Sequence, residues 1–555
     1  MNRRRFLASA ASVIAASNTG VWSAPRDRLT HVLRGALVFD GTGAPPREVD
    51  VAIEGDRIAA VGSRLDAGNV PETNLRGFAL APGFIDIHGH TDLGLLVNPQ
   101  AESKVRQGVT TEVTGQDGSS IGPWTDERHE EVQEGVRQRL GVDLPFGDIP
   151  GFFDWIDKHG AALNVASMVG QGTIRGYVVG PDDRQATDEE VRWMVDEVRA
   201  ALSAGACGLS SGLEYTPGAF AGTDEITELA AVLAGTGLPY ATHMRNEDDR
   251  VLAALEEALH IGRMAGVAVE ISHLKAQGGR NWWKAAPLLE LIDHANGSGL
   301  DVGFDVYPYI AYSTGLASLF PVGARDGGTD AFVERLQNDD ARTALEAPVR
   351  AKIDQLGGWG NVQISGTASE ALSWAHGQRL GALAAERDED PYALLVHLLV
   401  EDRGRSNMVG FGMSEENVER QLAHPLSIIC SDGGARATYG PLADDVPHPR
   451  TFGAFPRVLG HYVREREIMP LEAAIHKMTA LPARRLGLTD RGIIRPGAWA
   501  DLVAFDPSAV ADRATFENPH QYPAGIPHVW VNGVQVLSGG EQTGALPGRS
   551  VRPGR

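Results

Sequence analysis

Cysteine is almost absent from this chain, with two among 555 residues. That scarcity excludes a small disulfide-stapled fold and a cysteine-rich zinc finger. Cys207 and Cys430 both lie in short apolar runs, so we expect them to be buried and unpaired. Basic side chains are also in deficit, because 50 Lys and Arg face 72 Asp and Glu and leave a net charge of −22. A surface of that sign repels phosphate, so we expect no nucleic-acid partner and no docking to anionic lipid.

The N-terminus lacks a hydrophobic run long enough to span a bilayer, which takes about 20 residues. Three consecutive arginines and Phe6-Leu7 are followed by a small apolar stretch over residues 8–17. The Arg-Arg-x-Phe-Leu pattern resembles a twin-arginine export signal. We therefore interpret residues 1–24 as an export signal and expect a periplasmic mature protein without a membrane anchor. A basic N-terminus with no targeting role is the alternative.

Both ends of the chain are typical of short strands around tight turns. Near the start, runs such as residues 36–39 alternate with Asp-Gly turns, a pattern that indicates small antiparallel hairpins. Residues 529–536 repeat the pattern near the far end, around Asn-Gly. We therefore predict one small β domain, a β-sandwich built from residues 25–80 together with residues 490–555.

The middle of the chain alternates apolar strand runs with amphipathic helical stretches. Such alternation predicts a parallel sheet, and eight strands suit a closed (β/α)8 barrel. The predicted fold class is therefore α/β, with a TIM-like catalytic barrel over residues 81–489. The eight predicted strands are Phe84–His88, Val109–Thr114, Asn164–Val169, Ala206–Ser210, Tyr240–His243, Val267–His273, Leu300–Tyr307 and Ser427–Ser431.

Two further strand-like runs do not fit a count of eight. Residues 362–365 and 408–411 lie between the seventh and eighth predicted strands, with a helical stretch over about residues 329–356. Because these elements interrupt the alternation, we interpret residues 312–425 as carrying an insertion over the barrel mouth.

Five side chains that can bind metal fall at or just after predicted barrel strands. His88 and His90 end the first strand, where residues i and i+2 point to the same side. His243 closes the fifth strand, His273 closes the sixth and Asp432 follows the eighth. Each residue alone is commonly a hydrogen-bonded structural residue. Together they predict a metal site, because the carboxyl ends of barrel strands all face one mouth.

Ordered motifs give a more specific indication of function. The segments concerned are Gly170–Arg175, Ser211–Gly218, Thr242–Arg245, Ile271–Lys275, Tyr307–Tyr309, Ser431–Gly434 and His448–Arg450. Through these segments the sequence resembles the N-acyl-D-amino-acid deacylases (D-aminoacylases) of the amidohydrolase superfamily. The resemblance extends from about residue 31 to the C-terminus.

The resemblance implies zinc as the cofactor, present as one or two ions. His243 and His273 match the positions that hold the tightly bound zinc in that family. His88, His90 and Asp432 match a second, weaker site, and Asp432 would also carry the proton during hydrolysis.

The resemblance also implies the substrate-binding positions. Lys275, Tyr307, Ser313 and Arg450 match residues that contact the substrate, chiefly its free carboxylate. A guanidinium such as that of Arg450 can pair with a carboxylate in a bidentate manner, although spacing alone favours a surface ion pair. Tyr215 is a candidate hydroxyl for stabilising the tetrahedral oxyanion. The implied partner is a small molecule with a free carboxylate.

One position departs from the pattern of this family. These deacylases commonly carry Gly-Asn-Cys-Gly, with the Cys as a zinc ligand, where this chain has Gly-Gln-Asp-Gly at residues 115–118. A carboxylate can also bind zinc, so Asp117 is a candidate ligand. Alternatively, Asp117 is an Asx-turn residue before Gly118. No lysine ends any of the first four predicted strands, which disfavours a carbamylated-lysine centre of the hydantoinase type.

We therefore expect zinc-dependent hydrolysis of N-acyl-D-amino acids to a carboxylate and a free D-amino acid. Zinc lowers the pKa of bound water towards ~7, and Asp432 would take that proton and deliver it to the leaving amine. One alternative is a related amidohydrolase that acts on dipeptides or other N-blocked amino acids and amides. Another is an exported binding protein that has lost catalysis, which the presence of Asp432 disfavours because binding alone needs no proton shuttle.

Overall fold

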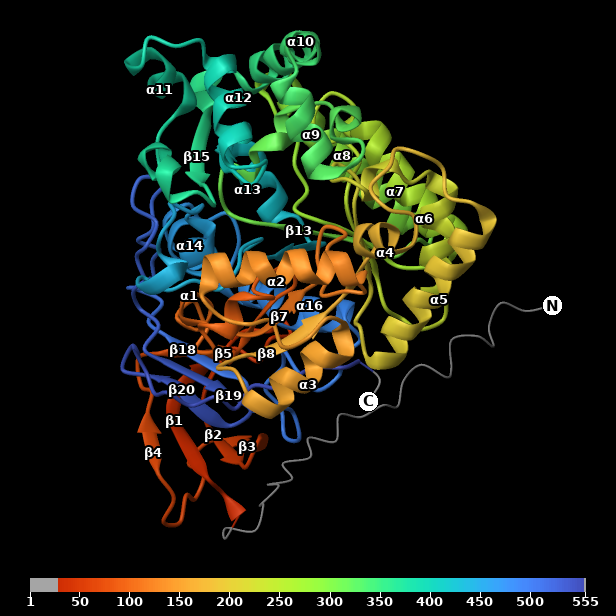
Figure 1. Cartoon of the computed structure of the whole chain (residues 1–555). Coiled ribbons are helices and arrows are strands. Elements are labelled where there is room, and N and C mark those ends of the chain that lie inside the picture. Colours follow the sequence, from red (N-terminus) through yellow and green to blue (C-terminus); the bar gives the residue numbers. More distant parts are fainter. Residues whose placement is uncertain (1–27, 554–555) are drawn as a thin grey trace, which may run out of the picture.

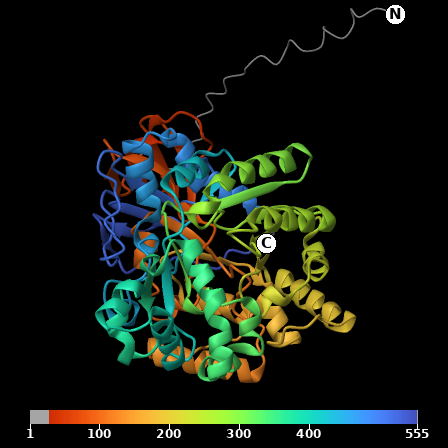
Figure 2. The same ribbon diagram turned by 90° about the horizontal axis from the view of Figure 1, so that it is seen from above.

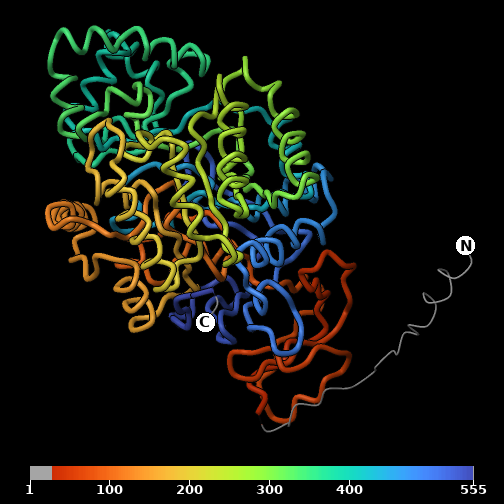
Figure 3. The backbone as a smooth tube through the Cα atoms, turned by 90° about the vertical axis from the view of Figure 1, so that its right-hand side faces the viewer, coloured from red at the N-terminus to blue at the C-terminus, as the bar shows by residue number. Residues whose placement is uncertain are grey.

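The computed structural model describes residues 28–553, so the predicted export signal at residues 1–24 lies outside the described residues. The chain forms a barrel, a sheet built from both ends of the sequence, and an inserted group of helices and strands (Figure 1). Figures 1 and 3 show the insertion and the sheet at opposite ends of the molecule. Within residues 28–553, no helix combines the length and the apolar content needed to cross a membrane.

Parallel strands form the barrel, in the order β6-β7-β8 and then β9-β10-β11-β12-β13-β17. Only Met168 separates β8 from β9, so these two segments follow one course and the predicted count of eight is confirmed. Cys207, before β10, and Cys430, after β17, are buried and free, as predicted. The segments are β6 (Phe84–Asp86), β7 (Val109–Thr114), β8 (Asn164–Ser167), β9 (Val169–Gly170), β10 (Leu209–Gly212), β11 (Tyr240–His243), β12 (Val269–Ile271), β13 (Val302–Val306) and β17 (Ser427–Ile429).

The barrel closes where the loops after its first and last strands run side by side. Gly89 and Gly433 form a parallel bridge between these loops. The Asp432 N–H donates to the His88 carbonyl at 2.9 Å, and the His90 N–H donates to the Gly433 carbonyl at 3.1 Å. Backbone pairing therefore fixes Asp432 beside the His-x-His segment, although more than 300 residues separate them in the sequence.

Helices cover the outside of the barrel, and their ends follow local sequence signals. In α5 (Asp188–Ala204), Thr187 and Glu190 form a capping box, and Gly205 ends the helix at a φ of 111°. The other helices around the barrel are α1 (Glu102–Val105), α2 (Asp126–Leu140), α3 (Ile149–His159), α4 (Gln171–Val178), α6 (Thr223–Ala230), α7 (Val251–Ala265), α8 (Ala285–Gly297), α13 (Glu415–Ala423), α14 (Arg450–Arg457), α15 (Leu471–Met478) and α16 (Ala480–Arg485).

Strands from both ends of the sequence share one nine-stranded sheet, in the order β21-β20-β19-β18-β5-β1-β2-β3, with β4 beside β1. Within it, β5 pairs in parallel with β1 and antiparallel with β18, which joins the two ends of the chain. Leu33, Ile53, Leu502 and Trp530 pack into its core. The strands are β1 (His31–Val38), β2 (Arg47–Glu54), β3 (Arg57–Gly62), β4 (Glu72–Asn74), β5 (Ala79–Pro82), β18 (Leu502–Phe505), β19 (His528–Val531), β20 (Val534–Ser538) and β21 (Glu541–Gln542).

The two surplus strand runs belong to a separate sheet, which explains why they did not fit the barrel count. This antiparallel sheet has the order β14-β16-β15 and accompanies four helices, which gather on one side of the molecule (Figure 2). Its elements are β14 (Tyr312–Gly315), α9 (Gly328–Gln337), α10 (Asp339–Leu356), β15 (Val362–Gly366), α11 (Leu380–Glu386), α12 (Pro391–Glu401) and β16 (Asn407–Gly410).

Candidate metal centre

The first and last barrel strands bring together a group of metal-binding side chains. His90 Nε2 lies 3.1 Å from Asp432 Oδ1, and His88 Nε2 lies 3.7 Å from the same oxygen. Asp117, after β7, completes this group, with its Oδ2 at 3.7 Å from His90 Nε2. The four ligand atoms all lie within 4.8 Å of one another. We refer to His88, His90, Asp117 and Asp432 as the His88 group.

A second group lies at the ends of β11 and β12. His243 Nδ1 is 3.0 Å from His273 Nε2, and His273 Nε2 is 3.4 Å from Asp117 Oδ1. These three residues also satisfy the 4.8 Å criterion, and we refer to them as the His243 group. Both histidines are buried, with exposed fractions of 4% or less.

Asp117 belongs to both groups, because its carboxylate lies between them. Its Oδ1 is 3.5 Å from His88 Nε2 and 3.4 Å from His273 Nε2. The backbone at Asp117 has a φ of 52°, in the left-handed region, and its Oδ1 is buried without a hydrogen-bond partner. The structure therefore places Asp117 as a bridge between two sets of imidazoles, in the position expected of a shared metal ligand.

Two atoms of this centre show that the residues fit a bound cation. His88 Nε2 and Asp117 Oδ1 are buried and have no hydrogen-bond partner. An unsatisfied buried polar atom costs about 1–3 kcal/mol, so native proteins rarely keep one without a ligand. Imidazole nitrogens and carboxylate oxygens are donors that zinc accepts, and two groups sharing one carboxylate can hold one or two ions.

A carboxylate lies behind each of the three buried histidines, and sequence reasoning missed all three. His88 Nδ1 is 3.4 Å from Asp305, His273 Nδ1 is 3.1 Å from Glu247, and His243 Nε2 is 3.5 Å from Glu214. Such partners fix the orientation of a metal-binding imidazole and make it more basic. The only available signal was one of position, since Asp305 is a charged residue inside the apolar β13 run, and Glu214 and Glu247 follow the ends of β10 and β11.

The charges at the centre favour a cation. Burial opposes ionisation of Asp432, but Arg450, His273 and His88 outweigh it and hold the pKa of this carboxyl below its usual range. Burial and Lys275 disfavour the protonated form of His273, yet Asp117 and Glu247 prevail and raise its pKa to about 9. The same carboxylates that attract this proton would attract a metal ion.

Three of the predicted substrate-binding residues meet beside Asp432. Arg450, at the start of α14, donates from Nη1 to Asp432 Oδ2 at 2.7 Å, and its guanidinium lies 4.7 Å from the centre of the Tyr307 ring. Its Nη2 is 3.5 Å from the backbone oxygen of Ser313. The Tyr307 hydroxyl is buried without a partner. Arg450 and Tyr307 therefore offer hydrogen-bond donors to a carboxylate bound beside Asp432.

The other two predicted substrate-binding residues lie beside the His243 group. The Tyr215 ring is 4.7 Å from the His243 ring, and the Tyr215 hydroxyl accepts a hydrogen bond from Thr314 at 3.2 Å. Lys275 Nζ is 2.7 Å from Glu247 and 2.6 Å from His273 Nδ1. Lys275 is thus held by an internal partner rather than directed at open space.

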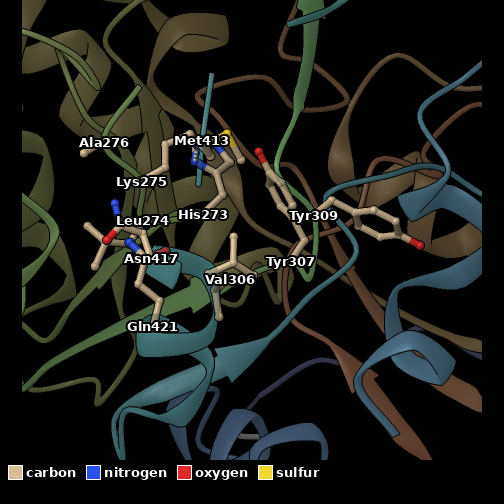
Figure 4. Close-up of a pocket in the computed structure, with 11 residues that line it drawn as sticks. His273, Leu274, Lys275, Ala276, Val306, Tyr307, Tyr309, Met413, Asn417 and Gln421 are labelled. Atoms are coloured by element: carbon tan, nitrogen blue, oxygen red, sulfur yellow. Dashed lines mark hydrogen bonds between the residues drawn. The ribbon is translucent and has the colours of Figure 1, made fainter. Parts of the chain in front are cut away.

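A small pocket, lined in part by His273, Lys275 and Tyr307, adjoins this part of the centre. Figure 4 shows the Lys275 and His273 side chains next to each other, with the Tyr307 hydroxyl turned towards them and the Tyr309 ring directed away. Met413 and Asn417, from the end of the insertion and from α13, form another part of the wall. Residues between the seventh and eighth barrel strands therefore contribute to the surroundings of the centre.

The chain is similar to known proteins along most of its length. Residues 440–537 match the model of a family described as the amidohydrolase family. A D-aminoacylase of Alcaligenes xylosoxydans xylosoxydans is 38% identical over 518 residues, which cover 93% of this chain and 96% of the relative. An N-acyl-D-glutamate deacylase of the same organism is 38% identical over 521 residues, covering 92% of this chain and 94% of the relative.

Solved structures show the same relationship. The crystal structure of an N-acyl-D-glutamate deacylase from Bordetella bronchiseptica, complexed with zinc and a phosphonate that mimics the tetrahedral intermediate, matches with a TM-score of 0.79. That match is 35% identical in sequence and covers 95% of this chain and all of the other. A dihydropyrimidinase from Brevibacillus agri, at 14% identity and a TM-score of 0.55 over 94% of this chain and 98% of the other, shares only the fold.

Proposed function

The chain belongs to the N-acyl-D-amino-acid deacylase family of amidohydrolases, and from this we propose that it is a zinc-dependent enzyme that hydrolyses N-acyl-D-amino acids. The products would be a carboxylate and a free D-amino acid. The observation that carries the proposal is the position of Asp432, whose carboxylate contacts both the metal-binding His90 and the cationic Arg450. A proton carrier and a carboxylate receptor thus lie next to the same metal centre.

The His243 group and the His88 group would hold the zinc, as one or two ions. Bound zinc would supply Lewis-acid chemistry, because it makes water more acidic and polarises an amide carbonyl. Asp305 and Glu247 would keep the His88 and His273 imidazoles oriented towards the metal.

Asp432 would act as general base and then as general acid. Its pKa is held low by Arg450 and the histidines, so the carboxylate is ionised and ready to accept a proton from the attacking water. The same oxygen would then deliver the proton to the nitrogen of the leaving amino acid. Both steps need Asp432 at the edge of the centre, where the barrel closure places it.

Arg450 and Tyr307 would bind the α-carboxylate of the substrate. A guanidinium has five N–H donors, and the bond to Asp432 uses one of them. The unpartnered Tyr307 hydroxyl beside it offers a further donor. Fixing the carboxylate at this corner limits how the groups around the α-carbon can be arranged next to Asp432, which is a physical basis for stereoselectivity.

Tyr215, beside His243, would stabilise the developing oxyanion. Its hydroxyl is held by Thr314 of β14, so the insertion helps to position a residue of the barrel mouth. Burial raises the pKa of the Tyr215 hydroxyl well above its usual value, with Asp117 adding to the effect, so the group stays protonated and can donate.

The deciding experiment measures amine release from matched N-acetyl-D- and N-acetyl-L-amino acids by the zinc-loaded protein. We expect release from the D series and little from the L series. Equal release from both would contradict the proposed stereoselectivity. Release from neither, with zinc bound, would contradict the proposed substrate class and turn the search to dipeptides and other amides.

We also propose export to the periplasm, on the Arg-Arg-x-Phe-Leu pattern alone. Fractionation of cells that express the full chain, beside a variant with Arg3 and Arg4 both replaced by Lys, would test it. The unchanged chain should be found in the periplasm and the variant in the cytoplasm. Cytoplasmic retention of both would contradict export.

A further inference from the structure

A buried ionic network lies next to the metal centre and takes no part in the mechanism above. Its centre is Lys104, on α1, whose side chain is fully buried. Lys104 Nζ is 2.6 Å from Asp86, 3.2 Å from Glu112 and 2.7 Å from the Ser431 hydroxyl. One ammonium therefore contacts the first barrel strand, the second barrel strand and the loop after the last.

The network holds the backbone on both sides of Asp432. Asp86 accepts hydrogen bonds from the Ser431 N–H at 2.9 Å and from the Ser431 hydroxyl at 2.5 Å. The Ser431 hydroxyl in turn accepts a hydrogen bond from the Gly433 N–H at 3.1 Å. Ser431 and Gly433 are the immediate neighbours of Asp432. Lys104 therefore contacts a residue, Ser431, that is adjacent to the proposed proton carrier in the sequence.

The same network supports the His-x-His segment. Glu112 accepts hydrogen bonds from Thr91, at 2.6 Å from its hydroxyl and 3.2 Å from its N–H. A Cβ added to Gly89 would lie 1.9 Å from Glu112 Oε1, so the backbone between His88 and His90 passes directly over this carboxylate. The Thr91 hydroxyl also accepts a hydrogen bond from the Ala435 N–H at 2.8 Å, which ties this segment to the loop of Asp432.

Asp432 needs such support because its backbone is unfavourable. Its φ of 49° lies in the left-handed region, which residues other than glycine enter only when their surroundings hold them there. An uncharged, well-packed replacement can often match a buried ion pair in stability. What the charged network offers in addition is directional bonding to the residues around Asp432.

We propose that Lys104 is a positioning residue, which acts through Asp86 and Ser431 to hold the Asp432 carboxylate at its place beside His90. The inference rests on the proposed function, in which Asp432 carries the proton and completes the second zinc site. It predicts that loosening the network slows the proton steps and weakens the second zinc, while the His243 group keeps the first.

The test compares Lys104→Met and Ser431→Ala with Arg491→Met. Arg491 is a matched control, because it forms a similarly buried ion pair with Asp501 beside the nine-stranded sheet. Lys104→Met leaves two buried carboxylates without their cation and can impair folding, whereas Ser431→Ala removes only one hydroxyl. The readouts are kcat, KM, the pH profile of kcat, the affinity for the second zinc by titration, and the thermal midpoint.

We expect kcat to fall about 100-fold in Lys104→Met and about 10-fold in Ser431→Ala, with KM within about threefold of the parent. The second zinc should bind about 10-fold more weakly in both variants, whereas Arg491→Met should lose thermal stability alone. A fall in kcat no larger than in the control would overturn the inference. If the unchanged protein shows no turnover, the proposed function fails, yet an unaltered second-zinc affinity in Ser431→Ala would still overturn this inference separately.

Discussion

Two regions of the molecule bury charged side chains at similar depth but leave them in different states. Between the barrel and the nine-stranded sheet, Asp501 accepts bonds from Arg491, from the Asn532 N–H at 2.7 Å and, more weakly, from Asn164. The Asn532 amide donates to Asn164 at 2.8 Å. At the carboxyl ends of the barrel strands, by contrast, His88 Nε2 and Asp117 Oδ1 are buried without partners.

This difference distinguishes a cluster that stabilises the fold from a cluster that binds a ligand. A buried polar cluster whose atoms are mutually satisfied is complete and has no need of a ligand. A cluster that keeps unpaired nitrogen and oxygen atoms facing one another lacks a component, and a cation supplies it. The comparison therefore predicts that substitutions at Asp501 change stability, whereas substitutions in the metal centre change metal content and turnover.

Asp432→Asn should give the largest loss of turnover among the substitutions considered in either region. The amide cannot accept a proton as the carboxylate does, so we expect kcat to fall by about 10³-fold or more. Zinc held by the His243 group should remain, because Asp432 is not one of its members. Steady-state kinetics together with metal analysis by mass spectrometry would show this. Near-normal turnover would remove Asp432 from its proton role.

Asp501→Asn is the matched change in the satisfied cluster. It weakens the bond to Arg491 and should lower the thermal midpoint, with kcat and zinc content unchanged. A loss of zinc in Asp501→Asn would break the comparison between the two regions.

The next largest effect is expected at Asp117, the carboxylate shared by the two groups. Asp117→Ala removes a ligand atom from both, so we expect zinc affinity to fall by about 100-fold and the second ion to be lost. Asp117→Cys is the informative companion, because the related deacylases commonly have Cys here, and it should retain zinc. Equal zinc stoichiometry in Asp117→Ala and the parent protein would mean that Asp117 is not a ligand.

Much of the fold and part of the site could be predicted from the sequence, for identifiable reasons. Strand periodicity located the barrel, and His88, His90, His243, His273 and Asp432 could be found because each ends or follows an apolar strand. The structure brings them together, as the barrel topology requires.

Other features depend on contacts that no sequence pattern encodes. The partners of Lys104 come from β6, β7 and the loop before Asp432, and only barrel closure unites them. Spacing alone could not identify Glu247 as the residue that holds Lys275 and His273. The bridging position of Asp117 depends on a backbone φ of 52°, so the sequence favoured a ligand but left a turn residue open as well.

Arg450→Ala tests whether the guanidinium beside Asp432 binds the α-carboxylate of the substrate. We expect KM for an N-acyl-D-amino acid to rise about 50-fold, because the α-carboxylate loses its cationic partner. The corresponding amino-acid amide lacks that carboxylate and is the matched control substrate. Asp432 also loses its partner, so kcat should fall for both substrates. Equal changes in KM for acid and amide would show that Arg450 is not the carboxylate receptor.

The smallest effect is expected at a buried charge that belongs to neither kind of cluster. Lys477, on α15, donates to the His424 carbonyl and to the Ser427 hydroxyl at 2.6 Å, near the amino end of β17, the strand whose other end leads to Asp432. Among residues 28–553, no carboxylate forms an ion pair with it, and burial lowers its pKa from 10.5 to about 7.

Between pH 7 and pH 10.5 the unfolded chain therefore binds a proton at Lys477 that the folded chain does not, so stability should rise with pH across this window. From pH 7 to pH 8.5 we expect this residue to add about 1.5 kcal/mol to the free energy of unfolding. Urea denaturation of the parent protein and of Lys477→Met at the two pH values would measure it. The parent should gain that much more than the variant, because methionine has no proton to lose. An equal increase in the free energy of unfolding for parent and variant would mean that Lys477 stays charged in the folded protein. Its two oxygen partners would then be enough to stabilise the charge, and Lys477 would resemble the satisfied cluster around Asp501.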